Sequence, residues 1–404
     1  MSLSNPTLLF RLYEEEIERS ISPRSETKIN GAIDYTFNYN MKLLHLFTKT
    51  GQSFAISPLA MTTSFVSLIV TFSDKTRKQL CRSIFNIDDL NEEEENLMLQ
   101  QTNLHLDLIL RNATDSMDFN LFLFIDEEYD IFPEYEKLFA ETLRMQVKYI
   151  NFRSNASQQI NQLIGQDEIT VSTEANMLLV GVTAFSPFWR KRLQKSEDLL
   201  AFHNEDSTIS FTRFLYGRGI YRIGRDQKFK CTVLEMRLEC HQMRMEWQNM
   251  SVVFYLPDEE MDINSISQAS KNECICEDIS RMIDTSSFPF EDVCVWIPEF
   301  RLHTKENMKP FIRELGINLM FDSESKNRLR VAKDTSSQCF ILDDIVQICT
   351  FETKANAVKQ EDEDIDDCSL FICNRPFMFA VTAVIRGNKV IIYQGLINKL
   401  LTQY

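Results

Sequence analysis

The sequence predicts an α+β fold, because helical patterns dominate the first half of the chain and strand patterns dominate the second. There is neither an internal repeat nor a regular alternation of strand and helix, which argues against a sheet built from βαβ units. No low-complexity linker divides the 404 residues. We therefore expect an N-terminal extension over residues 1–31, followed by one domain over residues 32–404.

The first half contains the clearest helix signals. Apolar residues recur at the spacing of an amphipathic helix between Phe37 and Phe47. In SFAISPLAMTTSFVSLIVTF, a short strand precedes Ser57 and Pro58. This pair predicts a helix start, because Ser caps free amides and Pro needs no N–H in the first turn. A further helix is expected from Pro133. VKYINF and EANMLLVGVTAF predict strands that are buried on both faces.

The second half is richer in strand patterns. KCTVLEMRL, MSVVFYLP, VCVWIPEFRLHT and CFILDDIVQICTF all predict strands, with a helical region before the third. KENMKPFIRELGI predicts a helix that ends at Gly316. The chain closes with SLFICNRPFMFAVTAVI, a turn at RGNK and VIIYQGLI, which predict a C-terminal hairpin.

The chain is acidic, with a formal net charge of −16 and a hydrophobic content of 44%. That hydrophobic content suffices for a large core, so wholesale disorder is excluded. An acidic chain repels nucleic acid and anionic lipid, so we expect neither as a partner and expect attraction to a protein with a basic surface. No stretch of about 18 apolar residues could span a membrane. We expect a monomer.

The ten cysteines are irregularly spaced, and several lie inside apolar strand patterns. Zinc-ribbon spacing is absent, because the close pair Cys274 and Cys276 has no second matching pair. We therefore interpret the cysteines as free, buried thiols that act as small hydrophobic residues. Free thiols and the lack of a secretory signal pattern predict a cytoplasmic protein.

No familiar catalytic or cofactor motif occurs: the nucleophile elbow, the H-E-x-x-H helix, the Walker loop and the dinucleotide fingerprint are all missing. The chain has only 10 glycines, and this scarcity counts against a phosphate-binding backbone loop. The acidic clusters Glu92–Glu95 and Glu361–Asp367 lack the spacing and glycine of a calcium loop. We expect no enzyme, no cofactor and no metal.

Seven segments, in the same order along the chain, resemble the serpin family. SFAISPLAMTTSFVSLIVTFSDKTRKQL resembles F-x-F-S-P-x-S-I followed by T-x-x-Q, and ANMLLVGVTAFSPF resembles N-x-x-Y-F-K-G-x-W-x-x-P-F. VLEMRL, MSVVFYLPDE, VWIPEFRL and LGINLMFD follow in serpin order, and CNRPFMFAV resembles the C-terminal signature F-x-x-x-[RH]-P-F-x-F. The matched residues are Ser57, Pro58, Thr76, Gln79, Asn176, Pro187, Phe188, Arg375, Pro376 and Phe377.

The resemblance covers about residues 32–404 and implies a serpin fold, with three β-sheets, eight or nine helices and an exposed reactive-centre loop at about residues 352–372. Inhibitory serpins act on serine or cysteine endopeptidases. The protease cleaves the loop, and the freed loop then inserts as a central strand of the large sheet and distorts the protease. Counting back from Pro376 places the cleaved bond near Ile365 and Asp366. Many members are extracellular, which is the alternative to a cytoplasmic location.

The hinge at the start of that loop departs from the family pattern. Inhibitory serpins carry E-G-T-E-A-A-A-A, whereas this chain has FETKANAVKQEDEDIDD. An inserted strand alternates its side chains between two buried faces, and either register would bury charged residues. Neighbouring carboxylates would add repulsion. The hinge residues are Thr353, Lys354, Ala355, Asn356 and Ala357, and the acidic loop residues are Glu361, Asp362, Glu363, Asp364, Asp366 and Asp367.

Three further departures concern the region where the large sheet must open. Ala184 stands where the family strand has a Trp. Asp343 stands where the family has a His that hydrogen-bonds toward Asn176, and a carboxylate can accept but not donate. INQLIGQDEITVSTEANM is shorter than the usual connection that lies over the sheet.

Two hypotheses follow from the sequence. In the first, the chain is a non-inhibitory serpin that binds a protein with a basic surface through its acidic loop. In the second, it is a working inhibitor of a serine or cysteine protease, cleaved near Ile365 and Asp366.

Overall fold

The computed structural model describes residues 25, 27–30, 42–113, 116–165, 169–227, 229–239, 250–258, 284–325, 327–333, 340–356, 368–385 and 388–402. These residues form helices and three sheets, of nine, five and two strands. This arrangement confirms the predicted α+β class.

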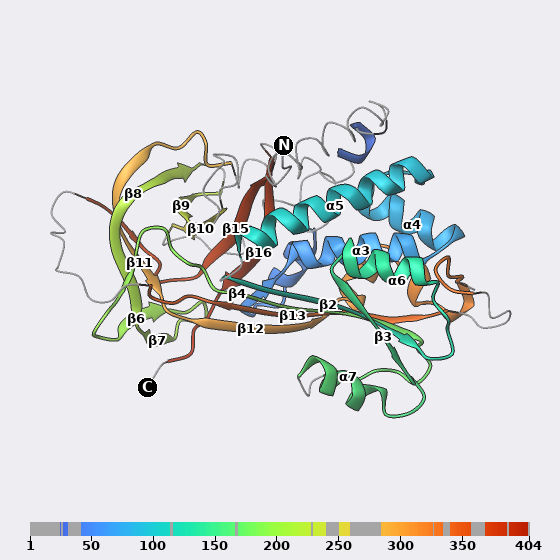
Figure 1. Ribbon diagram of the computed structural model, residues 1–404. Helices are drawn as coiled ribbons and strands as arrows, with labels where there is room; N and C mark the ends of the chain where they lie inside the picture. The colour runs from blue at the N-terminus through green and yellow to red at the C-terminus, as the bar shows by residue number, and fades with distance from the viewer. Residues whose placement is uncertain are drawn as a thin grey trace, which may run out of the picture.

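The five-stranded sheet runs through the middle of the molecule (Figure 1). In spatial order its strands are β12 (Arg301–Asn307), β13 (Leu342–Glu352), β4 (Met177–Phe185), β2 (Met117–Asp126) and β3 (Met145–Ile150). Strand β4 pairs in parallel with β13 and antiparallel with β2. Because β4 is central and covered on both faces, its sequence is a nearly continuous apolar run.

Helices cover both faces of this sheet. Helices α3 (Pro58–Thr71), α4 (Asp74–Phe85), α5 (Glu92–Asn112) and α6 (Pro133–Glu141) lie on one side, and α7 (Ala156–Ile164) lies on the other (Figure 1). The short helix α10 (Lys309–Glu314) follows β12. One hydrophobic core lies between the sheet and the first group of helices, and a smaller core, which includes Ile160 and Val346, lies under α7.

The predicted helix starts are confirmed at two places. Ser57 caps α3, since its side chain accepts a hydrogen bond from the N–H of Ala60, and Pro58 is the first helical residue. Pro133 likewise begins α6. The start of α5 was not predicted, although Asn91 and Glu94 form a reciprocal capping box there.

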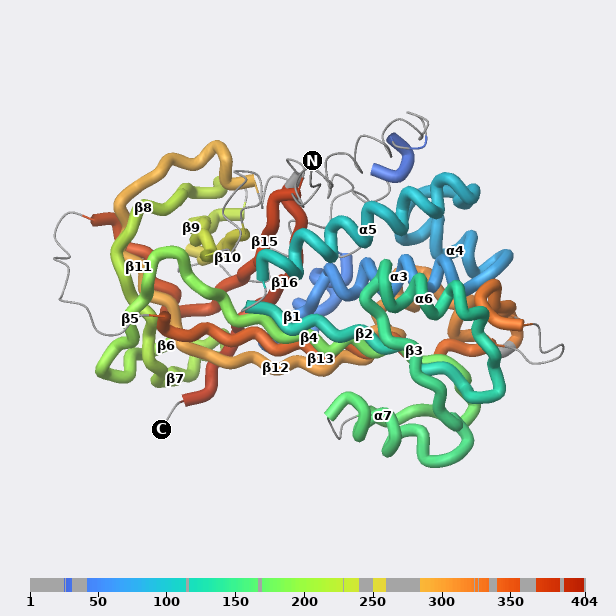
Figure 2. The backbone as a smooth tube through the Cα atoms, viewed as in Figure 1, coloured from blue at the N-terminus to red at the C-terminus, as the bar shows by residue number. Residues whose placement is uncertain are grey.

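The nine-stranded sheet stands at one end of the five-stranded sheet, as the tube in Figure 2 shows. Along its main path the strands are β1 (Phe54–Ile56), β16 (Asn388–Ile397), β15 (Phe377–Ile385), β10 (Met250–Pro257), β9 (Cys231–Arg237), β8 (Phe214–Asp226), β11 (Phe290–Pro298) and β14 (Ser369–Ile372), while β5 (Gln194–Lys195) pairs with β8. The hairpin of β6 (Leu200–His203) and β7 (Ile209–Thr212) forms the third sheet. A second large core includes side chains of both large sheets.

Several predicted elements are confirmed with corrected boundaries. The segment SLFICNRPFMFAVTAVI forms two strands, β14 and β15. Between them Arg375 donates two hydrogen bonds to the carbonyl of Pro257. The long strands β2 and β8 were not predicted. The helical region expected before β11 lies outside the described residues.

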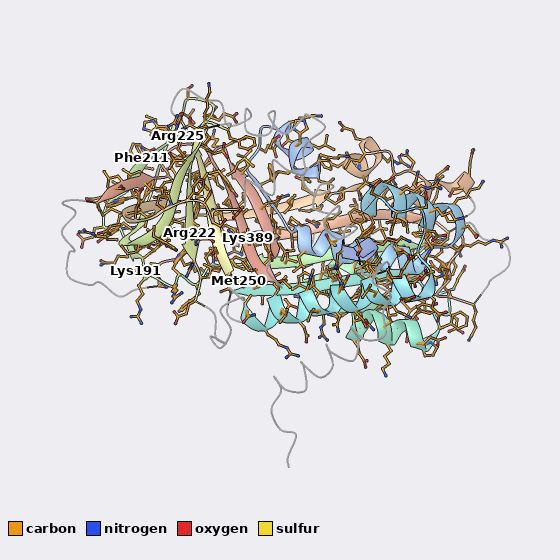
Figure 3. The ribbon with its side chains drawn as sticks, turned by 90° about the horizontal axis from the view of Figure 1, so that it is seen from above. Lys191, Phe211, Arg222, Arg225, Met250 and Lys389 are labelled. Carbon is orange, nitrogen blue, oxygen red and sulfur yellow. A yellow bond between two sulfur atoms is a disulfide. The ribbon has the colours of Figure 1, made fainter. Side chains whose placement is uncertain are left out.

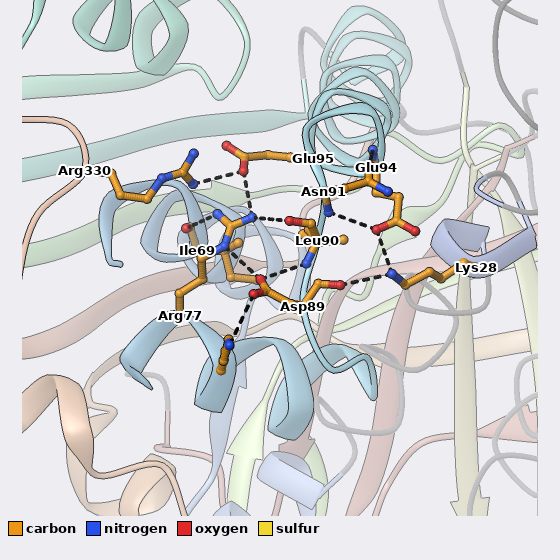
Figure 4. A network of polar contacts seen from close by, with 10 residues as sticks. Lys28, Ile69, Arg77, Asp89, Leu90, Asn91, Glu94, Glu95 and Arg330 are labelled. Atoms are coloured by element: carbon orange, nitrogen blue, oxygen red, sulfur yellow. Dashed lines mark hydrogen bonds and ion pairs between the residues drawn. The ribbon is translucent and has the colours of Figure 1, made fainter. Parts of the chain in front are cut away.

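A partly buried ion-pair network joins α4 and α5 to a distant segment (Figure 4). The guanidinium of Arg77, nearly buried, lies 2.7 Å from Glu95 and 3.2 Å from Asp89, and it also donates to the carbonyl of Ile69. Arg330 binds the same Glu95 at 2.9 Å. Sharing one carboxylate between two cations fixes the helix ends against the segment that carries Arg330.

Part of the predicted N-terminal extension packs onto this region. Lys28 lies 2.6 Å from Glu94 of α5, and Ile29 is fully buried in the core. The boundary at residue 31 stays a prediction.

Candidate functional site

The hinge residues continue directly from the end of β13, and most of their polar groups are bonded. Thr353 is fully buried. Its N–H donates to the carbonyl of Phe300 and its hydroxyl donates to that of Pro298, each across 2.9 Å. The N–H of Phe300 donates back to the Thr353 hydroxyl. The first hinge residue is therefore fastened to the turn between β11 and β12.

The next hinge residues are held by the turn that follows β4. The indole N–H of Trp189 donates to the carbonyl of Lys354 across 3.1 Å. The side-chain amide of Asn356 donates to the carbonyl of Trp189 (2.6 Å) and accepts from the N–H of Leu193 (2.9 Å). Asn356 thus bridges both ends of the basic turn that contains Arg190–Arg192, and Ala355 packs against the core between the sheets. Lys354 is exposed and pairs with Glu352.

The middle of the loop lies outside the described residues. This applies to Ala357, to the acidic residues Glu361–Asp367 and to the expected cleavage position at Ile365 and Asp366. The chain is described again from Cys368, immediately before β14.

Cys368 forms a disulfide with Cys294 of β11, with Cα atoms 6.0 Å apart. This corrects the interpretation of all cysteines as free thiols: β11 and the edge strand β14 are parallel neighbours, which brings two cysteines 74 residues apart in sequence into contact. Sequence spacing carried no signal of it. The cytoplasmic location stays a prediction.

Four described cysteines do fit the original interpretation. Cys81, Cys231, Cys349 and Cys373 are free and buried. Burial raises the pKa of Cys81 to about 11 and that of Cys231 to about 12. These thiols stay protonated at neutral pH and act as apolar residues.

Strands β4 and β13 pair along a line that we call the seam. The last residues that pair are Phe185, at the end of β4, and Phe351, one residue before the end of β13, and their rings are buried and stacked with planes 7° apart. Any strand added between β4 and β13 would have to separate this pair.

Most side chains on both sides of the seam are apolar. Leu179 and Ile345 face the core under α3, whereas Val180, Val346 and Ile348 face the core under α7, and all five are buried. On the α3 side the buried polar residues Thr183 and Gln347 interrupt this lining, and both are already hydrogen-bonded, Thr183 to Cys349 and Gln347 to the backbone of Ser57. A charged side chain placed between Ile345 and Phe351 would meet no charged partner in either register.

A family model described as Serpin (serine protease inhibitor) matches residues 36–396. The chain belongs to the serpin family. Serpins are mostly protease inhibitors rather than enzymes.

Named serpin relatives are distant. Ovalbumin of Coturnix japonica is 23% identical over 350 residues, which cover 80% of this chain and 88% of ovalbumin. Serpin B7 of Homo sapiens is 21% identical over 299 residues, covering 68% and 73%. Antichymotrypsin-2 of Bombyx mori is 21% identical over 252 residues, covering 60% and 62%.

Solved serpin structures share the fold. A native protease nexin-1 structure with heparin has a TM-score of 0.73 at 20% identity and covers 92% of this chain and 99% of its own. A tumour suppressing serpin has a TM-score of 0.74 at 13% identity, with the same coverage. At such identities the likeness establishes the fold alone.

The family strand has a Trp where this serpin has Ala184, but a Trp follows five residues later, at Trp189. The indole of Trp189 is fully buried, and its ring centroid lies 6.3 Å from that of Phe254. Its N–H donates to the carbonyl of Lys354 in the hinge. A Trp beside the matched Pro187-Phe188 pair was the available sequence signal for it.

Asn176 and Asp343, the two predicted sheet-opening residues, use different partners. The Asn176 side chain accepts from the N–H of Ile341 (2.7 Å) and donates to the hydroxyl of Tyr129 (3.1 Å). Asp343 accepts from the N–H of Ser172 (3.1 Å). The departure at Asp343 is thus accommodated by backbone donors.

A bulge lies beside these residues. The register between β4 and β13 shifts between Leu342 and Ile345, around Asp343 and Asp344. Burial raises the pKa of Asp343 and raises that of Asp344 to about 6, although Asp344 accepts from the N–H groups of Lys309 and Ile345. The seam therefore begins at two carboxyl groups that are poorly hydrated.

No three His, Cys, Asp or Glu side chains in the described part of the chain are grouped as a metal site would require. None of the described helices is both long and apolar enough to cross a membrane.

Proposed function

We propose that this serpin is a binding protein that contacts a basic protein surface through its acidic loop. The loop stays outside the five-stranded sheet and does not insert between β4 and β13. The observation that carries the proposal is the mostly apolar, uncharged lining of the seam between Ile345 and Phe351. An inserted loop would bury Lys354 and Asp362 in one register, or Lys359, Glu361 and Glu363 in the other.

Between Ile345 and Phe351 of β13, and along β4 opposite them, the seam holds no charged side chain. Lining residues such as Leu179 and Val346 are apolar, and the buried polar residues Thr183 and Gln347 are uncharged and already hydrogen-bonded. An unpaired charge buried there costs on the order of several kcal/mol. The family's mechanism needs insertion to be strongly favourable.

The anchored hinge adds to this barrier. Residues 353–356 would lose their hydrogen bonds to Pro298, Phe300, Trp189 and Leu193 on entering the sheet. Each such bond contributes about 1 kcal/mol net.

Cleavage of the loop tests the proposal directly. A non-target protease would cut the chain between residues 357 and 367, with the cut located by mass spectrometry, and the melting temperature of the cut protein would be compared with that of the intact protein. We expect little change. A rise of tens of degrees would mean that the loop inserts, and the proposal would fail.

A matched variant shows whether charge is the obstacle. In it Lys354, Lys359, Glu361, Asp362 and Glu363 are all replaced by Ala. After cleavage this variant should gain thermal stability that the cut wild type lacks. If neither gains stability, the anchored hinge or the closed seam, rather than charge, prevents insertion.

The second candidate function is protease inhibition with cleavage near Ile365 and Asp366. The family match and the similarity to a protein named antichymotrypsin favour it. Incubation with a panel of serine and cysteine proteases distinguishes the two functions. A covalent complex that survives denaturing electrophoresis supports inhibition, whereas simple cleavage or no reaction supports the binding protein.

A further inference from the structure

One face of the nine-stranded sheet exposes a set of large apolar and aromatic side chains. Strands β8, β11 and β14 are neighbours, and their register places alternate residues on the same side. We call this side the outer face. Its residues are Tyr216, Trp296 and Ile372 in one row, Arg218, Cys294 and Leu370 in the next, Ile220 and Asp292 in the third, and Arg222 and Phe290 in the fourth.

The opposite side of the same strands is core. Val293, Val295 and Phe371 alternate with the outer residues and are almost completely buried. The sheet therefore has one ordinary inner face, and the apolar residues on its outer face do not serve that core.

Exposure of the outer face is high for residues of this type. The exposed fractions are 66% for Ile220, 53% for Phe290, 59% for Leu370 and 38% for Ile372. These side chains lie on three adjacent strands rather than singly. Contiguous exposed apolar surface of this kind marks a site of protein association.

Aromatic and arginine side chains add the composition of an interface centre. Tyr216 and Trp296 stack with ring centroids 4.7 Å apart. The guanidinium of Arg222 lies 4.6 Å from the ring centroid of Phe290. Tyr, Trp and Arg are the residues most enriched among those that dominate binding energy.

The described residues of the outer face carry a small positive charge, from Arg218 and Arg222 against Asp292, on a chain of net charge −16. Arg218 binds Asp292 with three contacts of 2.8–3.1 Å. Those hydrogen bonds, with a further contribution from Lys191, hold the pKa of Asp292 below its usual value. Arg222 lies 4.0 Å from Glu235, but Glu235 also binds Lys389 at 3.4 Å. Among the described residues of these ion pairs, the cations Arg218, Arg222 and Lys389 outnumber the carboxylates Asp292 and Glu235.

Figure 3 shows Lys191 and Arg222 at the end of the molecule that β8 occupies, together with Arg225, which is paired with Asp258. A carboxylate-bearing surface would be attracted to this end even though it is repelled by most of the chain.

The disulfide makes the outer face rigid. It ties the four-residue edge strand β14 to β11 at Cys294, close to Leu370. A preformed surface loses little conformational entropy when it binds.

We propose that the outer face is a docking surface for a protein whose contact area combines apolar side chains with carboxylates. A second copy of this chain is a poor occupant, because two such faces would bring like charges together. The inference does not depend on whether the loop inserts into the sheet.

The probe is a fluorescein-labelled peptide of about 12 residues that alternates Leu and Glu, with a Leu–Lys peptide as its counterpart. Binding is measured by fluorescence anisotropy. We expect the acidic peptide to bind the full chain and the basic peptide to bind at least tenfold more weakly. The double variant Ile220→Ser/Leu370→Ser and the single variant Arg218→Gln should each bind the acidic peptide at least tenfold more weakly than the wild-type protein does.

Leu163→Ser and Leu401→Ser are the matched controls, because these exposed leucines lie outside the outer face. They should bind the acidic peptide like wild type, and melting temperatures verify that every variant is folded. Equal loss in the controls, or equal binding of both peptides, overturns the proposal. The proposal also fails if a sulfated polysaccharide displaces the peptide and Ile220→Ser/Leu370→Ser binds the peptide as well as wild type, because the face would then bind anions through charge alone. It fails as well if the wild-type chain sediments as a dimer and Ile220→Ser/Leu370→Ser sediments as a monomer, because the face would then bind a second copy of the chain.

Discussion

The side-chain amide of Asn356 donates a hydrogen bond to the backbone carbonyl of Trp189 across 2.6 Å. The same amide accepts from the N–H of Leu193, and the Trp189 indole bonds the carbonyl of Lys354. The turn after β4 and the start of the loop are thus held together by side chains from both. Release of the loop requires all three bonds to break.

Replacing Asn356 with Ala should loosen this attachment. The Leu193 N–H loses its acceptor, so its amide should exchange with deuterium faster, and the free energy of unfolding should fall by about 1 kcal/mol. Asn356→Asp is the control, since it keeps an oxygen for Leu193 but cannot donate to Trp189. Unchanged Leu193 exchange in Asn356→Ala would show that the bond is not formed in solution.

Removing the disulfide should destabilise the protein and free β14. Cys294→Ser/Cys368→Ser should lower the free energy of unfolding by about 2–4 kcal/mol, because the crosslink restricts a long segment of the unfolded chain. Limited proteolysis should then cut near residues 368–372 faster than in wild type. Added reductant should have this effect on wild type and none on the double variant. Identical wild-type behaviour with and without reductant contradicts the prediction.

Asp344 should make stability fall as pH rises through its pKa. Burial raises that pKa from 3.8 to about 6, so the ionised carboxylate is favoured more in the unfolded chain than in the folded one. The penalty is absent below pH 4, develops between pH 4 and 6, and is complete above that range. Asp344→Asn keeps the acceptor oxygen for Lys309 and Ile345, so it should stabilise the protein at pH 7.5 by about 1–3 kcal/mol.

The measurement for Asp344 is the difference in melting temperature between Asp344→Asn and wild type across pH 4–8. That difference should grow with pH, since other titrating groups are common to both proteins. A difference that is constant with pH would show that Asp344 is hydrated.

Arg77 and Arg82 should differ sharply in their effect on stability. Arg77→Met leaves the mostly buried Glu95 with one cation fewer, so it should lower the free energy of unfolding by about 3–5 kcal/mol. Arg82 pairs with Asp88 on the open surface, so Arg82→Met should change stability by less than about 1 kcal/mol. Chemical denaturation of both variants tests the contrast, and equal effects contradict it.

Local patterns sufficed for much of the fold. The Ser57-Pro58 helix start, the central strand β4 and the C-terminal hairpin depend on caps, periodicity and turn residues, which act within a few positions of the chain. Strand β8 was missed because its pattern mixes Gly, Arg and apolar residues, with one face on the core and one on the solvent.

The candidate site was predicted in part. The resemblance of FETKANAVKQEDEDIDD to the family's hinge pattern predicts the hinge at residues 353–357, but nothing in the sequence pointed to the partners of Asn356. The pairing of Cys294 with Cys368 was missed for the same reason, since contacts between residues far apart in the chain leave no local pattern.

By itself, the sequence determined the family, the fold class, the acidic charge and the conflict between charged hinge residues and a buried strand. These depend on residue identity and on short-range order. Only the tertiary structure decided which side chains hold the hinge, what lines the seam and which apolar residues lie together on the outer face. Such features require strands β4, β8, β11, β13 and β14 to meet, and their contacts form only when the chain has folded.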